Sequence, residues 1–82
     1  MKLLVLTPIR ELYSGEVDAV KVPGTSGQFE ILKGHANIVS ALSKGVVNVT
    51  EVGGNKFDFE IKQGFVEVLK NEVSVLVTTA NE

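Results

Sequence analysis

Apolar and polar residues alternate with a period of two along most of this chain of 82 residues. The alternation is clearest at Phe57, Phe59 and Ile61, which are separated by charged residues. A period of two is typical of a strand with one face in the core and the other in water. We therefore expect these three side chains to point into the protein.

Two hairpins are predicted in the second half of the chain. The β-branched run of residues 46–52 precedes the strand at 57–61, and Gly53-Gly54-Asn55 between them supplies the positive φ of a tight turn. Residues 65–69 and 73–78 form a second pair of strand-like runs, separated by residues 70–72, in which Asn71 is suited to the left-handed region.

The first half is less regular. Residues 3–7 and 17–22 are strand-like, with a corner expected at residues 13–15, and Pro8 and Pro23 are expected to close strands. Residues 38–42 fit a helical turn as well as a strand. Short strands at intervals of about ten residues predict an all-β fold, a small β-sandwich or flattened barrel of about eight to ten short strands, in one domain over residues 1–82.

Residues 24–36 contain three of the eight glycines and the single histidine. Gly24, Gly27 and Gly34 are expected to bend this segment into successive tight turns around the short apolar piece at 29–32. Such shaped loops often carry contacts. His35 is interpreted either as a ring that hydrogen-bonds the folded loop or as an outward contact residue, and the two roles are compatible.

The last two predicted strands carry apolar side chains on both faces. Phe65 and Leu69 oppose Val66 and Val68, and Leu76 opposes the neighbouring valines. A sandwich strand needs only one apolar face, so the second face is covered either by loops or by another chain.

Composition narrows the function classes. The chain has no cysteine, a net charge of −2 and a pI near 5.3, and its lysines are scattered, which argues against a nucleic-acid or anionic-lipid surface. No run approaches the roughly 20 apolar residues of a membrane span, so direct membrane insertion is not expected. One histidine with no convergent acids or thiols predicts no catalytic residues, no metal site and no cofactor. The expected partner is a protein.

The glycine-rich segment resembles the signature of the epsilon subunit of F-type ATP synthases, whose pattern is Gly-Glu-Phe/Leu-Gly-Ile-Leu-Pro-Gly-His-Ala. The matching run is Gly27-Gln28-Phe29-Glu30-Ile31-Leu32-Lys33-Gly34-His35-Ala36. Tyr13-Ser14-Gly15 and the segment from Gly64 to Ala80 are similar to flanking parts of the same family. This chain departs from the pattern at Gln28, Glu30 and Lys33, and Gln63 stands where the family often has a second glycine before Gly64.

The resemblance implies a non-catalytic rotor subunit at the foot of the central stalk, monomeric in isolation. It would link the gamma subunit to the membrane c-subunit ring, at the cytoplasmic face of the membrane as a peripheral component, and transmit torque for ATP synthesis. The resemblance assigns ring contact to Gln28, Phe29, Glu30, Lys33, Gly34 and His35. The expected structural glycines are Gly24, Gly27, Gly34 and Gly64.

Typical family members continue past the position of Ala80 into an α-helical hairpin. Here only Asn81 and Glu82 follow the last predicted strand. The sequence is therefore similar to the β-sandwich domain alone, as a naturally short form or a piece of a longer chain. We expect these 82 residues neither to bind ATP nor to inhibit hydrolysis as the helical hairpin does.

Two other classes of function are alternatives to a rotor subunit. A biotinyl- or lipoyl-type swinging-arm carrier domain has a similar size and would present a lysine on a hairpin. Lys44 is the candidate, although it lacks the flanking Met or Asp. A small nucleic-acid-binding barrel is opposed by the acidic pI and by the lack of interleaved aromatic and basic residues.

Overall fold

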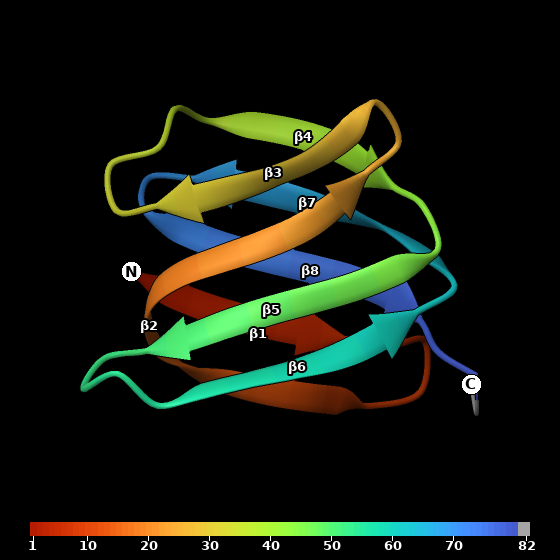
Figure 1. Ribbon diagram of the computed structural model, residues 1–82, viewed down its shortest axis with the longest axis horizontal. Coiled ribbons are helices and arrows are strands. Elements are labelled where there is room, and N and C mark those ends of the chain that lie inside the picture. Colours follow the sequence, from red (N-terminus) through yellow and green to blue (C-terminus); the bar gives the residue numbers. More distant parts are fainter. Residues whose placement is uncertain (81–82) are drawn as a thin grey trace.

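The computed structural model describes residues 1–80; Asn81 and Glu82, expected to follow the last strand, lie outside the described residues. The described chain consists of strands and turns without a helix, and the predicted all-β fold is confirmed (Figure 1). Accordingly, no helix among residues 1–80 has the length and apolar character needed to cross a bilayer. The eight strands are β1 (Lys2–Leu6), β2 (Glu11–Gly24), β3 (Gly27–Leu32), β4 (Ile38–Leu42), β5 (Gly45–Glu51), β6 (Lys56–Ile61), β7 (Gln63–Leu69) and β8 (Glu72–Thr78).

All eight strands belong to one sheet that folds back on itself, with the order β1-β8-β7-β4-β2-β5-β6 and with β3 paired to β2. The long β2 strand connects the two layers, because its first half pairs with β1 and its second half pairs with β3 and β5. A register shift between Val17 and Ala19 marks the point where β2 passes from one layer to the other. A parallel pairing of β1 with β8 completes the other layer.

The prediction of a corner at residues 13–15 is wrong, because all three residues lie inside β2. Gly15 pairs with Leu3, and a Cβ atom on Gly15 would lie 2.6 Å from the Tyr13 hydroxyl. Gly15 is therefore needed because the Tyr13 side chain lies over it, and the backbone stays extended. Pro23 is the penultimate residue of β2, consistent with its predicted place at a strand end.

Both predicted hairpins are confirmed. The β5–β6 turn contains Gly53 and Gly54 with φ of 99° and 94°. In the β7–β8 turn, Asn71 has the expected positive φ of 65°, and Lys70 also has one, of 49°. Leu69 pairs with Glu72, so this turn has two central residues, both left-handed, as in a type I′ turn.

The ambiguous segment at residues 38–42 is a strand, β4. It pairs along its whole length with β7, from Ile38 opposite Val68 to Leu42 opposite Gly64. Five residues are too few for helical periodicity to compete with this pairing.

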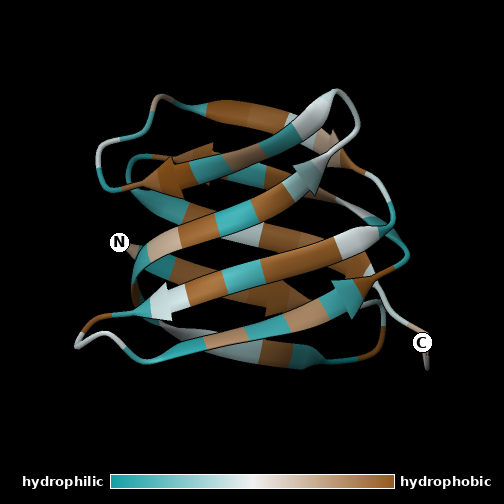
Figure 2. Ribbon diagram, viewed as in Figure 1, coloured by the Kyte–Doolittle hydropathy of each residue, from teal (hydrophilic) through white to brown (hydrophobic). Residues whose placement is uncertain are grey.

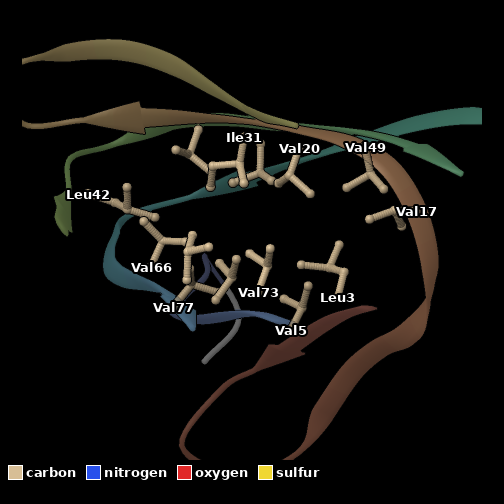
Figure 3. Close-up of a cluster of buried hydrophobic side chains, with 14 of the residues drawn as sticks. Leu3, Val5, Val17, Val20, Ile31, Leu42, Val49, Val66, Val73 and Val77 are labelled. Atoms are coloured by element: carbon tan, nitrogen blue, oxygen red, sulfur yellow. The ribbon is translucent and has the colours of Figure 1, made fainter. Parts of the chain in front are cut away.

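Side chains from the two layers meet in a valine-rich core (Figure 3). Val20, Ile31 and Val49 come from one layer, and Val66 and Val73 from the other. Along the front strands the hydropathy alternates residue by residue, as the sequence pattern predicted (Figure 2).

One core prediction needs correction. Ile61 is buried, but Phe57 and Phe59 are only half-buried and pack against the margin of the core. Among the described strands β6 pairs with β5 alone, so it lies at an edge of the sheet.

Candidate interaction surfaces

An apolar row crosses the outer face of the layer formed by β1, β8, β7 and β4. Leu76 pairs with Leu6 on one side and with Phe65 on the other. Phe65 in turn pairs with Ala41. We call these four residues the apolar stripe. Phe65 is 58% exposed and Leu76 is 47% exposed, so no described loop covers this second apolar face.

An open groove of about 520 Å³ runs beside the stripe. Its lining is mostly apolar, and Pro8, Gln63 and Thr78 join the stripe residues in forming it. An exposed apolar face beside a groove is typical of a protein-binding surface.

The glycine-rich segment forms a turn on each side of the short apolar piece, as the sequence predicted, but the piece itself is a strand rather than part of one shaped loop. Gln28, Phe29 and Glu30 lie on β3, which pairs with β2; residues 25–26 form the turn before this strand, and residues 33–37 form the loop after it. We call residues 33–37 the His35 loop. Gln28 and His35 therefore lie near opposite ends of β3 (Figure 1).

The residues predicted to contact the ring differ in how far their side chains are exposed. Gln28 and Glu30 point outward on β3, and Lys33 is exposed in the His35 loop. Phe29 is half-buried and packs against the core. Phe29 is therefore a packing residue, because alternation along β3 turns it inward between two outward neighbours.

The four predicted structural glycines are required for two different reasons. Gly27 and Gly34 have positive φ, of 130° and 84°. Gly24 and Gly64 instead lie where a side chain has no room: a Cβ atom on Gly24 would be 2.7 Å from the carbonyl oxygen of Gly27, and one on Gly64 would collide with the carbonyl oxygen of Leu76. The constraint at Gly24 is therefore the close approach of β2 and β3.

Hydrogen bonds attach the His35 loop to the β7–β8 turn. The Lys70 N–H donates to Asn37 Oδ1 at 2.9 Å, and the Gly34 N–H donates to Asn71 Oδ1 at 3.3 Å. We call this reciprocal pair of bonds the asparagine clasp. The His35 N–H also donates to the Leu32 carbonyl at 3.0 Å, which closes the turn after β3.

The His35 ring takes part in the local structure of its loop. Its Nδ1 lies 2.7 Å from the Ala36 carbonyl oxygen. A carbonyl only accepts, so Nδ1 carries the proton, and Nε2 is the nitrogen free to meet a partner. The side chain is half-buried, which accommodates both roles considered from the sequence.

A polar cluster fixes the β5–β6 turn to β2. The Tyr13 hydroxyl donates to Glu51 Oε2 at 2.6 Å, and Asn55 Nδ2 donates to Glu51 Oε1 at 2.7 Å. The hydrogen bond to Glu51 raises the pKa of Tyr13 to about 12, and the same bond, with that of Asn55, lowers the pKa of Glu51. The Tyr13 and Phe57 rings lie 5.1 Å apart in a tilted arrangement. This cluster is structural, since its polar atoms are bound to one another.

Residues 1–80 contain no group of three or more His, Cys, Asp or Glu side chains placed to hold a metal ion. Lys44, the lysine considered for a carrier role, follows Ser43 in the short turn between β4 and β5.

Comparison with known proteins decides the family. Residues 1–82 match the model of the beta-sandwich domain of the ATP synthase Delta/Epsilon chain. The chain belongs to this family. The carrier-domain alternative is not favoured by this match.

Two curated relatives of the Delta/Epsilon family illustrate the similarity. The chain is 39% identical over 80 residues to an ATP synthase epsilon chain of Helicobacter pylori, covering 98% of this chain and 64% of the relative. It is 37% identical over 76 residues to the ATP synthase epsilon chain of Campylobacter jejuni, covering 93% of this chain and 59% of the relative. The chain thus spans about three fifths of the length of these relatives.

Solved structures share the fold of this Delta/Epsilon-type domain. A chain in the Euglena gracilis mitochondrial ATP synthase (OSCP/F1/c-ring) superposes with a TM-score of 0.83 at 24% identity, over 92% of this chain and 48% of that one. A chain in the central stalk/c-ring of the Tetrahymena thermophila mitochondrial ATP synthase gives 0.78 at 20% identity, over 95% and 63%. At these identities the likeness establishes the fold.

Sequence reasoning missed two features of the surface. Leu6 and Ala41 enter the apolar stripe only through strand register, and local sequence patterns do not give register between distant strands. Asn37 was not singled out, and Asn71 was assigned only its backbone role. An asparagine beside each of two loops is a weak signal until the fold places the loops together.

Proposed function

We propose that this chain is a rotor component of an F-type ATP synthase, which links the gamma subunit to the c-subunit ring and transmits torque between them. Its place is peripheral to the membrane that carries the complex, on the cytoplasmic face. Membership of the Delta/Epsilon family supports this proposal. The observation that carries it is the exposed apolar stripe on a chain whose relatives are ATP synthase subunits.

The apolar stripe and its groove are the proposed gamma-binding face. Cross-strand pairing gathers these side chains into one contiguous patch on the outer face of a sheet. Burial of such a patch against a partner provides the main favourable free energy of association. This assigns gamma to the face formed by β1, β8, β7 and β4.

The ring-binding surface is the outer side of β3 together with the His35 loop. Gln28, Glu30, Lys33 and His35 offer polar groups there, and the left-handed Gly34 shapes the loop. Phe29 is excluded because it packs inward. The His35 loop lies where β4 begins, and the apolar stripe crosses the other end of β4, so this loop and the stripe are separated by the length of β4 (Figure 1). Gln28 lies at the other end of β3, nearer the stripe.

Torque transmission requires a stiff connection between these surfaces. The close-packed valine core and the continuous strand pairing between the layers give the domain low compressibility. In this proposal nucleotides are handled by other subunits.

The experiment compares variants on each surface for binding to the purified gamma subunit and, separately, to the detergent-solubilised ring from the same source. We expect Phe65→Ser to weaken gamma binding alone, and Gln28→Ala or His35→Ala to weaken ring binding alone. The loop variants should lose about 1 kcal/mol of stability or less, because they leave the core unchanged. The proposal is contradicted if wild-type protein binds neither partner, or if the loop variants bind the ring normally while melting much lower.

A further inference from the structure

The asparagine clasp joins the His35 loop to a second segment, the β7–β8 turn. In each of its two bonds an asparagine oxygen accepts from a backbone N–H of the other segment. Neither segment therefore moves independently without breaking both bonds. The turn is further tied to the N-terminal strand, because the Lys2 N–H donates to the Asn71 carbonyl.

The two segments that the clasp joins each carry an exposed lysine. Lys33 belongs to the His35 loop and Lys70 to the turn, and both side chains are exposed. The salt bridge found among residues 1–80 joins the N-terminal amine to Glu16, so neither lysine is neutralised by an ion pair in the described chain. His35 lies in the same loop as Lys33, so the clasp connects the segment that carries the imidazole and one ammonium group to the segment that carries the other.

We propose that Asn37 and Asn71 are positioning residues that hold Lys33, His35 and Lys70 as one contact surface, and that Lys70 binds the same ring loops as His35. This inference rests on the proposed function and extends its ring-binding surface to the β7–β8 turn. The partner chemistry that fits is a polar loop presenting oxygen acceptors, since the surface offers ammonium and imidazole groups.

Preorganisation explains why the clasp matters for binding. A loop that is already ordered loses less conformational entropy when a partner docks on it. The left-handed Lys70 and Asn71 restrict the turn, and the clasp passes that restriction to the His35 loop. Binding should therefore depend on Asn37, because its Oδ1 accepts the bond from the Lys70 N–H that joins the two segments.

The first test measures binding to the detergent-solubilised ring over a range of salt concentrations. Lys70→Gln removes the charge and keeps a polar, slightly shorter side chain, and the backbone N–H of residue 70 still donates to Asn37. Lys44→Gln is the matched control, because Lys44 is exposed in the turn at the other end of β4. We expect about five-fold weaker binding and a shallower salt dependence for Lys70→Gln, and no change for Lys44→Gln.

The second test removes the clasp. Asn37→Ala deletes the acceptor, and Asn37→Asp keeps an oxygen in its place. Amide hydrogen exchange at Lys70 should accelerate on the order of ten-fold in the alanine variant and return to the wild-type rate in the aspartate variant. In the Asn37→Ala background, Lys70→Gln should cost less ring affinity than it does in the wild type, a non-additivity that simple destabilisation would not produce.

The outcomes separate this inference from the proposed function. Wild-type protein that fails to bind the ring contradicts the proposed function itself. If the wild type binds and Lys70→Gln binds equally well, the inference is overturned and the function stands. The inference is also overturned if the losses of ring affinity caused by Asn37→Ala and Lys70→Gln are fully additive. It is overturned as well if the Asn37→Ala variant leaves the rate of amide hydrogen exchange at Lys70 unchanged.

Discussion

Replacing Phe65 with serine tests the proposed gamma-binding face most sharply. Phe65 lies at the centre of the apolar stripe, with Leu76 on one side and Ala41 on the other. Its ring is exposed, so the folded domain does not depend on it for its core.

The expected magnitude follows from the exposed area. A phenylalanine side chain buries about 200 Å² when fully covered, so a residue that is 58% exposed has roughly 115 Å² left for a partner. At about 25 cal/mol per Å² this area contributes roughly 3 kcal/mol at most. We expect a loss of about 2–3 kcal/mol, equivalent to roughly 30- to 150-fold weaker binding.

The assay is titration calorimetry of each variant with the purified gamma subunit, with thermal melting measured in parallel. Val52→Ser is the control, because Val52 is an exposed valine beside the β5–β6 turn, outside the stripe. The free energy of unfolding of Phe65→Ser should lie within about 1 kcal/mol of the wild-type value, since a cross-strand side-chain pair contributes no more than that. Equal gamma affinity for Phe65→Ser and the wild type, or a loss as large for Val52→Ser, would refute the assignment of this face.

Three further predictions concern the fold. Tyr13 is the single tyrosine, so an ultraviolet titration of the phenol should show a midpoint near pH 12, and Glu51→Gln should bring that midpoint back toward 10. Because Tyr13 keeps its proton more tightly when folded, its contribution to stability is complete below pH 10 and is lost as the pH rises toward 12. The contribution to stability of Glu51, whose pKa is lowered by folding, is complete above its ordinary value of 4.5 and is lost as the pH falls through the lowered pKa. Denaturant titrations at a series of pH values should show both losses of stability, and Tyr13→Phe should remove the loss at alkaline pH. Gly64→Ala should cost about 1–3 kcal/mol in chemical denaturation, since its Cβ would collide with the Leu76 carbonyl, and an unchanged midpoint would contradict the close approach. Phe59→Ala should cost about 2 kcal/mol, below the about 3–5 kcal/mol of a fully buried phenylalanine, because the side chain is half-buried; complete unfolding would show that it supports more of the core.

Local sequence signals predicted the hairpins well. The Gly53-Gly54 turn and the left-handed Asn71 are determined by residues within the turn itself, so their chemistry is visible in the sequence. The period of two gave the correct inward parity at Ile61. It did not give the depth of burial at Phe59, because depth depends on whether a strand has neighbours on both sides.

Non-local geometry explains the remaining errors. Tyr13-Ser14-Gly15 has the composition of a turn, but pairing with β1 keeps it extended. The glycines at residues 24–36 predicted the turns on either side of the apolar piece, but not that pairing with β2 makes this piece a strand, β3. Likewise the apolar stripe was visible only as an excess of apolar residues on two strands, since the register across β1, β8, β7 and β4 is a property of the folded sheet.

The central claim is that one rigid domain binds two partners through separate surfaces. The most direct measurement is analytical ultracentrifugation of this chain mixed with the purified gamma subunit and the detergent-solubilised ring of the same source. We expect a single ternary complex, in which gamma and the ring sediment together at limiting concentration only when this chain is present. Competition, in which saturation with gamma displaces the ring from this chain, would contradict it.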